Sequence, residues 1–234
     1  MRRVFITGAT GYMGRELSAR LAARGHVVRA LARRGSEHRT AAGCETVIGD
    51  ALDGASYTAS VLGCDTLVHL VGVAHPAPSK AAQFREVDLR SVRAAVAAAS
   101  DSRVESFVYV SVAHPAPVMK AYIAARVEAE ELVRAAGFRA TILRPWYVLG
   151  PGHRWPLLLV PVYRLLEMAP STREAAKRLA LVTLPQIVEA LVHAVENPPS
   201  GVRVMEVPEI RRLRQETGKR ETRQLPNPIS GLDA

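Results

Sequence analysis

The sequence predicts an α/β fold built on a doubly wound parallel sheet, with a small insertion in its C-terminal part. Through residue 150, short apolar segments alternate with longer segments whose apolar residues recur every three or four positions. A glycine-rich turn joins the first apolar segment to the first helical one. At 234 residues and 48% hydrophobic composition, the chain suits one well-cored domain. Strands separated by helices pair in parallel through right-handed crossovers, so we expect an open sheet covered on both faces.

Strands are expected where short apolar runs lie between turn residues, and helices where one face is apolar. In the first helix, Leu17 and Leu21 share a face and Gly25 ends the element. The expected strands span residues 2–8, 26–33, 45–50, 65–74, 106–113, 139–150 and 201–207. The expected helices span residues 14–25, 55–64, 83–100, 121–137 and 184–197.

The chain is expected to form a single domain over residues 1–210, followed by a polar, basic tail over 211–234. After Gly150 the regular alternation gives way to a Pro-rich, apolar insertion, and residues 145–205 are expected to build the substrate side. From Arg211 onward the sequence has no periodic apolar face. Such a segment is expected to be flexible or held only by a partner.

The chain carries a formal net charge of +9, which favours a phosphorylated cofactor, an acidic lipid surface or a nucleic acid as partner. No helix-turn-helix signature or aromatic RNA-binding motif accompanies the arginines, so no nucleic-acid partner is expected. Cys44 and Cys64 have neither a CxxC nor a Cys/His ligand spacing. This cysteine usage predicts a reducing compartment and no metal site.

The sequence predicts a cytoplasmic protein. The N-terminus enters the first strand directly and leaves no room for a signal peptide. The most apolar later stretch, residues 155–169, is interrupted by prolines and charged residues. It falls short of the ~20 apolar residues that a transmembrane helix needs.

The stretch "TGATGYMG", residues 7–14, lies where the first strand turns into the first helix. Gly8 permits the tight turn, Gly11 lets a pyrophosphate approach the backbone, and Gly14 lets the helix pack closely on the sheet. The helix N-terminus adds N–H donors and the positive end of its dipole. The GxxGxxG spacing differs by one residue from the dehydrogenase GxGxxG. Its place in a βαβ unit predicts a dinucleotide site in a Rossmann fold.

The end of the second strand selects the dinucleotide. An acidic residue there would accept a hydrogen bond from the ribose 2′-OH and select NAD. This chain has Arg33 and Arg34 instead, with no acid until Glu37. A guanidinium pairs with a 2′-phosphate in bidentate fashion, so the predicted cofactor is NADP(H). The alternative interpretation is two solvated arginines on a basic protein.

Several separate motifs resemble those of the short-chain dehydrogenase/reductase superfamily, in its extended and atypical branches. "TGATGYMG" resembles the cofactor loop, "VIGDALD" the third-strand motif, "DTLVHLVG" the fourth strand and "FVYVSV" the fifth. "LRPWYVLGPG" resembles the segment that closes over the nicotinamide. The resemblance covers about residues 1–205 and is closest to the NmrA-like proteins and the NADPH-binding accessory subunit of respiratory complex I.

The resemblance implies further cofactor contacts. Asp50 would hydrogen-bond the adenine and Ala51 would line its pocket, while the fourth strand would pass under the adenine-ribose side. With the glycine turn and the two arginines, the expected cofactor-binding residues are Gly8, Thr10, Gly11, Tyr12, Met13, Gly14, Arg33, Arg34, Asp50, Ala51, Leu70, Val71, Gly72 and Pro145.

The resemblance also implies a catalytic set of Ser111, Tyr122 and Arg126. The spacing of four residues puts Tyr122 and Arg126 on one side of the expected helix. In active members the tyrosine is the general acid/base, and a lysine at the position of Arg126 lowers its pKa and holds the nicotinamide ribose. Arginine keeps the charge but has a bulkier, fixed fork. A second departure is Asp88, in a region where the family usually carries asparagine.

Other polar residues lie close by in the sequence. His114 and Lys120, in the loop before Tyr122, are alternative proton donors. His75 lies in a similar loop, because "VAHPAP" occurs at both 73–78 and 113–118. A lone loop histidine is more often only a surface residue.

An aromatic group is expected beside the nicotinamide. It consists of Trp146, Tyr147, His153 and Trp155. Such a wall suits a small-molecule substrate that is flat or apolar. The stretch from Leu157 to Leu159 and the helix after it are expected either to extend this wall or to form an exposed patch for a membrane or a protein partner, and the alternative is the core of a small subdomain.

Three functional hypotheses stay open. The first is an NADP(H)-dependent oxidoreductase acting on a small carbonyl, quinone or isoprenoid-like compound, in which Tyr122 donates the proton with help from Ser111 and Arg126. The second is a non-catalytic NADP(H)-binding sensor, and the third is a structural or assembly subunit that docks on a membrane complex. Retention of Ser111 and Tyr122 favours the first, and loss of the lysine and asparagine favours the others. The resemblance also implies a homodimer through helices flanking the fifth strand.

Overall fold

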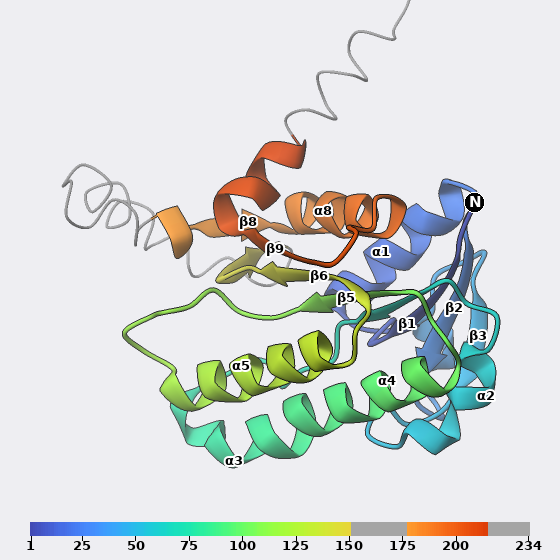
Figure 1. Cartoon of the computed structure of the whole chain (residues 1–234), viewed down its shortest axis with the longest axis horizontal. Helices are drawn as coiled ribbons and strands as arrows, with labels where there is room; N and C mark the ends of the chain where they lie inside the picture. The colour runs from blue at the N-terminus through green and yellow to red at the C-terminus, as the bar shows by residue number, and fades with distance from the viewer. Residues whose placement is uncertain (151–176, 215–234) are drawn as a thin grey trace, which may run out of the picture.

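The computed structural model describes residues 1–150 and 177–214. In these ranges, seven strands form one sheet in the order β3-β2-β1-β4-β5-β6-β9, and each neighbouring pair is parallel (Figure 1). The strands are β1 (Arg3–Thr7), β2 (Val27–Ala32), β3 (Glu45–Ile48), β4 (Thr66–His69), β5 (Ser106–Val110), β6 (Arg139–Arg144) and β9 (Val202–Glu206). The order runs outward from β1 in both directions, so the predicted doubly wound fold is confirmed.

Helices cover both faces of the sheet, as Figure 1 shows. On one face lie α1 (Tyr12–Ala23) and α8 (Leu184–Glu196), and on the other lie α2 (Thr58–Val61), α4 (Arg90–Asp101) and α5 (Lys120–Ala135). Leu17 and Leu21 of α1, which the pattern placed on one face, are fully buried in one core with Leu191 of α8. A second core on the opposite face includes Phe107 of β5 and Val133 of α5.

The strand expected over residues 139–150 is in fact two strands in two sheets. β6 belongs to the main sheet, whereas β7 (Tyr147–Leu149) pairs with β8 (Leu181–Thr183) in a separate two-stranded sheet. Pro145 lies between them, and a proline has no N–H to donate to a ladder. The chain therefore leaves the main sheet where β6 ends.

The helix expected over residues 83–100 also has a break. After η3 (Pro78–Lys80) and α3 (Ala81–Gln83), the chain forms a π-helical segment, η4 (Phe84–Leu89), before α4 begins. Such segments are rare and occur often at functional sites. This one buries both Phe84 and Asp88.

Smaller differences concern short elements. The helix expected over residues 55–64 is η2 (Gly54–Ser56) followed by the single turn of α2, and η1 (Glu37–Arg39) follows β2. Beyond β9, residues 207–214 form a helix in which Ile210 is buried and Leu213 packs on the first core. The predicted tail is therefore helical over 211–214, and 215–234 lie outside the described residues, as does the insertion 151–176. Within the described ranges, no helix is long and apolar enough to cross a bilayer.

Candidate functional site

The turn between β1 and α1 depends on the absence of side chains. Gly8 has a φ of +76°, which L residues rarely adopt, and its carbonyl accepts a hydrogen bond from Gly11 N at 3.0 Å. A Cβ on Gly14 would lie 2.2 Å from Gly8 O, so the helix can start this close to the strand only at a glycine. Gly11 is the N-cap of α1, and no side chain caps the helix. Because no side chain caps this first turn, its N–H groups fit a dinucleotide phosphate.

The other residues of the turn are partly covered by neighbouring elements. Thr10, Tyr12 and Met13 are half-buried, and Met13 packs against the first core. A Cβ on Gly150 would overlap the Tyr12 hydroxyl, at 1.4 Å. The end of β7 therefore closes against the glycine turn, and a larger residue at position 150 would displace Tyr12.

The residues predicted for the adenine half lie at the ends of β2 and β3. Arg33 and Arg34 follow β2, both are exposed, and neither forms an ion pair with a described residue. Asp50 follows β3 and is exposed, and its Oδ1 accepts a hydrogen bond from Leu52 N at 3.0 Å. Ala51 is half-buried against the second core. Among the described residues these two guanidinium groups form no ion pair, so they are available to an anionic ligand.

The segment after β4 connects the turn to the predicted catalytic helix. Leu70 N donates to Thr7 O at 3.1 Å, and a Cβ on Gly8 would lie 3.0 Å from Leu70 C. Val71 follows, and a Cβ on Gly72 would lie 2.2 Å from Arg126 Nη2. Residues 70–72 therefore run between the glycine turn and Arg126, and Gly72 leaves the space that the guanidinium occupies.

Arg126 lies in α5 with its side chain 7% exposed and forms an ion pair with a fully buried carboxylate. Its Nη2 lies 2.5 Å from Asp88 Oδ1, and Asp88 Oδ2 accepts from Val73 N at 3.1 Å. Its Nη1 donates to Val110 O at 2.8 Å and to the Tyr109 hydroxyl at 3.3 Å. Burial acts to lower the pKa of Arg126, but Tyr109, Tyr122 and Asp88 together raise it, so the group is a permanent cation.

Tyr122 lies one helical turn before Arg126, and the structure brings the two together. The Arg126 guanidinium carbon lies 5.2 Å from the centre of the Tyr122 ring. The centre of the Phe84 ring lies 4.9 Å from the centre of the same ring. Burial raises the pKa of Tyr122, and the Arg126 cation opposes that rise. The phenol is therefore protonated at neutral pH.

Ser111 belongs to a different buried cluster. Its hydroxyl donates to Glu130 Oε1 at 2.6 Å, and the same carboxylate accepts two bonds from Arg144, from Nε at 2.9 Å and from Nη2 at 2.5 Å. His114 Nε2 lies 3.4 Å from Glu130 Oε1. Burial acts to raise the pKa of Glu130, and the hydrogen bonds from Arg144 and Ser111 outweigh burial and lower that pKa. The Ser111 hydroxyl is thus engaged with a carboxylate on α5.

A buried histidine, not anticipated from the sequence, connects the turn to the Arg126 cluster. His69 ends β4 with no exposed surface, and its Nδ1 lies 2.8 Å from the Thr7 hydroxyl. Its Nε2 lies 3.2 Å from the Ser91 hydroxyl, which donates to Asp88 O. Burial lowers the pKa of His69 to about 3, so the ring is neutral. The available signal was a histidine inside an apolar strand, since a buried imidazole needs hydrogen-bond partners.

The other predicted residues are more peripheral. His75 and Lys120 are exposed, and Pro145 is buried with its carbonyl accepting from Ala113 N at 3.0 Å. Trp146 and Tyr147 are half-buried. His153 and Trp155 lie outside the described residues.

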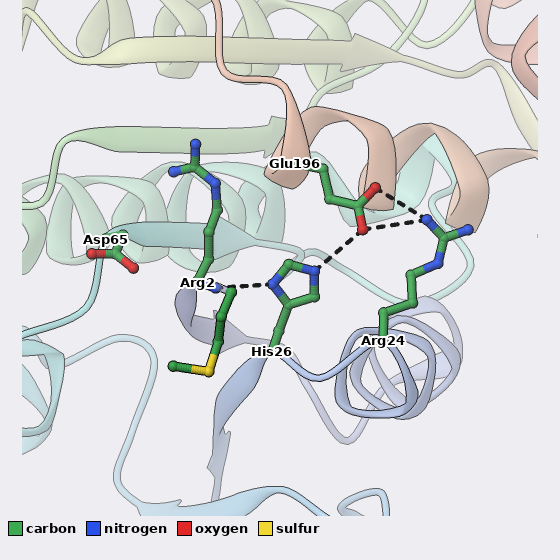
Figure 2. A pocket seen from close by; sticks show the side chains of 6 residues that line it. Arg2, Arg24, His26, Asp65 and Glu196 are labelled. Atoms are coloured by element: carbon green, nitrogen blue, oxygen red, sulfur yellow. Dashed lines mark hydrogen bonds and ion pairs between the residues drawn. The ribbon is translucent and has the colours of Figure 1, made fainter.

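A hollow of about 590 Å³ lies at the opposite, amino edge of the sheet (Figure 2). His26 lies between Arg2 and Glu196 there, with its Nδ1 accepting from Arg2 N at 3.2 Å and its Nε2 at 3.2 Å from Glu196 Oε1. Arg24 pairs with the same Glu196 at 3.1 Å. These groups satisfy one another at the end of the sheet away from the glycine turn, so the hollow is not the dinucleotide site.

The doubly wound sheet and its uncapped glycine turn define the class of nucleotide-binding Rossmann proteins. The family model described as NAD(P)H-binding matches residues 8–153, and the chain belongs to this family. The protein therefore has an NAD(P)-binding domain with a reductase/epimerase-like fold. The predicted resemblance to an NAD(P)-binding family is confirmed, and the fold is that of solved members of the short-chain dehydrogenase/reductase superfamily, whereas the NmrA-like branch stays a prediction.

Two curated relatives are named as reductases. The chain is 31% identical over 170 residues to the 4-hydroxy-2-methyl-3-oxo-4-farnesyl-3,4-dihydroquinoline-1-oxide ketoreductase of Stigmatella aurantiaca, covering 63% of this chain and 51% of that protein. It is 29% identical over 211 residues to the ceramide reductase of Caulobacter vibrioides, covering 89% of this chain and 65% of that protein. In both cases the chain spans less than two thirds of the relative's length.

Solved structures agree on the fold. The Bordetella bronchiseptica enzyme WbmH in complex with NAD+ superposes with a TM-score of 0.66 at 20% identity, over 97% of this chain and 84% of that one. A short-chain dehydrogenase/reductase superfamily protein from Agrobacterium tumefaciens with bound NAD gives a TM-score of 0.64 at 20% identity, over 87% and 77%. At this identity the likeness extends to the fold alone.

Proposed function

We propose that the protein is an NADP(H)-dependent reductase acting on a carbonyl compound with a large apolar part. The observation that carries the proposal is the Tyr122 phenol held against the Arg126 guanidinium, in the same domain as the glycine turn. A positioned phenol is suited to hand a proton to a carbonyl oxygen. The names of the two curated relatives support both the reaction class and the apolar substrate.

In this proposal the cofactor is held by backbone and by cations. The first turn of α1, opened by Gly8, Gly11 and Gly14, holds the pyrophosphate. Arg33 and Arg34 hold the 2′-phosphate, because both guanidinium groups are exposed and unpaired among the described residues. The remaining contacts proposed are Thr10, Tyr12, Met13, Asp50, Ala51, Leu70, Val71, Gly72 and Pro145.

The proposed reaction adds one hydrogen to carbon and one to oxygen. Reduced nicotinamide supplies the hydride to the carbonyl carbon when it is bound. Tyr122 donates its phenolic proton to the carbonyl oxygen and regains one from solvent. Because the Ser111 hydroxyl donates to Glu130, the proposal assigns proton transfer to Tyr122 alone. Trp146 contributes an apolar wall for the substrate.

The first test is a fluorescence titration of the purified protein with NADPH and with NADH. Removing both guanidinium groups, as Arg33→Ala with Arg34→Ala, is expected to weaken NADPH binding roughly tenfold or more and to leave NADH binding unchanged. Arg39→Ala, an exposed arginine in η1, is the matched control and keeps both affinities. Preference of the wild type for NADH would contradict the 2′-phosphate assignment.

The second test is turnover. A panel of ketones bearing acyl or prenyl chains is offered with NADPH, and oxidation of the cofactor is followed by its absorbance. Tyr122→Phe is expected to lower the rate about a hundredfold or more while NADPH affinity stays unchanged. Full activity in this variant would remove Tyr122 from the proton-transfer step.

A second candidate function is a non-catalytic NADP(H)-binding module. It is favoured because the Arg126 guanidinium already contacts groups of the protein itself, namely Asp88, Tyr109 and Val110 O, rather than pointing its N–H groups at a ligand. Tight NADPH binding without turnover of any panel member would favour this candidate. A homodimer, a peripheral membrane or protein-complex contact and a cytoplasmic location stay predictions.

A further inference from the structure

The two departures from the family pattern, Asp88 and Arg126, form one ion pair. Asp88 has no exposed surface, the Arg126 side chain is 7% exposed, and their charged atoms lie 2.5 Å apart. A buried guanidinium without a partner would be costly, and arginine does not lose its proton in proteins. Burial raises the pKa of Asp88, and the adjacent guanidinium opposes that rise by favouring the ionised carboxylate.

One short segment places this carboxylate and also packs on the phenol. The π-helical η4 contributes Phe84, whose ring lies 4.9 Å from the Tyr122 ring, and Asp88, which pairs with Arg126. Gly72 completes the arrangement, since a Cβ there would lie 2.2 Å from Arg126 Nη2. The carboxylate is thus built into the wall around Tyr122 rather than added at the surface.

The ionisable groups around Tyr122 come from three elements. Arg126 lies on its own helix, Asp88 on η4, and the neutral Tyr109 phenol on β5. An uncompensated guanidinium beside the Tyr122 ring, with its carbon 5.2 Å from the ring centre, would favour the phenolate. A cation paired with a carboxylate presents only a dipole, so much of that preference is cancelled.

We propose that Asp88 is a positioning residue for the proton of Tyr122: by neutralising Arg126 it keeps the phenol protonated, which suits the site to proton donation in carbonyl reduction. The inference rests on the proposed function. In that reaction a C–H bond forms with the hydride of the reduced nicotinamide dinucleotide, which is oxidised. The O–H bond of Tyr122 breaks as the new alcohol O–H bond forms. The reverse reaction would need the phenolate, which the pair disfavours.

The test follows the ionisation of Tyr122 directly, by titrating the ring-carbon chemical shifts of isotope-labelled tyrosine, with Tyr122→Phe to assign the signal. The wild-type midpoint is expected above the ~10 of a free tyrosine. In Asp88→Asn, which leaves the guanidinium uncompensated, the midpoint is expected to fall by at least about one pH unit. In the double variant Asp88→Asn, Arg126→Gln, both charges are gone and the midpoint returns to the wild-type value.

A matched control separates this effect from the general loss of a buried ion pair. Glu189, 4% exposed, pairs with Arg20 and Arg24 on the opposite face of the sheet. Glu189→Gln therefore removes a buried carboxylate from its ion pairs with two partly exposed arginines, and it is expected to leave the Tyr122 midpoint unchanged.

Three results would overturn the inference: a wild-type midpoint below ~10, no shift in Asp88→Asn, or a raised midpoint in the double variant. Should Asp88→Asn fail to fold, the wild type and the double variant still decide. The titration needs no turnover, so it is separate from the test of the proposed function. An unmoved midpoint with NADPH-dependent turnover intact removes only the role of Asp88.

Discussion

The glycine turn and the Arg126 cluster (Asp88, Tyr109, Tyr122 and Arg126) both lie toward the carboxyl edge of the sheet, but they depend on opposite features of the sequence. The turn lies within eight consecutive residues and depends on side chains that are absent. The cluster draws on η4, β5 and α5 and depends on charges that compensate one another. In the turn, the choice of residue at each glycine position is limited separately, by contact with the backbone. In the cluster, the residues at positions 88 and 126 limit each other, because their charges form one ion pair.

The largest expected effect breaks the turn. In Gly14→Ala the new Cβ would meet Gly8 O at 2.2 Å and Ala9 Cα at 2.7 Å, so strand and helix must separate. We expect loss of dinucleotide binding and a fall of about 4 kcal/mol in the free energy of unfolding, measured by NADPH titration and urea denaturation. Gly201→Ala is the control, because a Cβ there meets nothing within 4 Å. Normal binding by the Gly14 variant would show that the turn accepts side chains.

The next effect tests the compensation in the cluster. Asp88→Asn leaves a buried guanidinium unpaired and is expected to lower the free energy of unfolding by about 3 kcal/mol. Arg126→Gln leaves the carboxylate unpaired and is expected to cost a similar amount. The double variant is expected to recover most of this loss, since neither charge remains. Urea denaturation of the four proteins completes the cycle, and additive losses would mean that the two positions are independent.

A pH experiment probes His69, which joins the two regions. Its folded pKa of about 3 lies below the ordinary ~6.5, so between these values the unfolded chain binds a proton that the folded chain does not. Stability is therefore lost as pH falls from 6.5 towards 3, by up to about 1.4 kcal/mol per pH unit from this group. His69→Asn is expected to show a shallower loss between about pH 6 and 4.5, worth about 2 kcal/mol. His38→Asn, at an exposed histidine, is the control. Parallel curves for His69→Asn and the wild type would contradict a neutral, buried His69.

The smallest effect concerns Ser111, in the second buried cluster on α5. Ser111→Ala removes the hydroxyl that donates to Glu130, while both bonds from Arg144 remain. We expect a loss of about 1 kcal/mol in the free energy of unfolding. Thermal and urea denaturation measure it, with Ser79→Ala, an exposed serine in η3, as the control. An unchanged stability would mean that the bond to Glu130 contributes nothing, and Ser111 would regain its place as a candidate helper of Tyr122.

Local patterns predicted the sheet and the turn with little error. Leu17 and Leu21 fall on the buried face of α1 because helical periodicity depends on neighbours three and four residues apart. Gly8, Gly11 and Gly14 were identifiable because their spacing is local: Gly8 has a φ of +76°, and a Cβ on Gly11 or Gly14 would meet Gly8 O within the same turn. The predicted boundaries were wrong where a local feature interrupts a regular pattern. Pro145 divides the expected strand at 139–150, and a π-helical turn interrupts the expected helix at 83–100.

The amino-acid sequence by itself determined the doubly wound fold, the glycine turn and the placing of Tyr122 and Arg126 on one side of a helix, because each follows from short-range geometry. Only the tertiary structure decided what those side chains contact. It paired Arg126 with Asp88, 38 positions earlier, and it directed Ser111 to Glu130. Asp88 and Arg126 looked like independent departures in the sequence, but they form one ion pair in the structure. A charged side chain is buried at low cost only where folding places an opposite charge beside it.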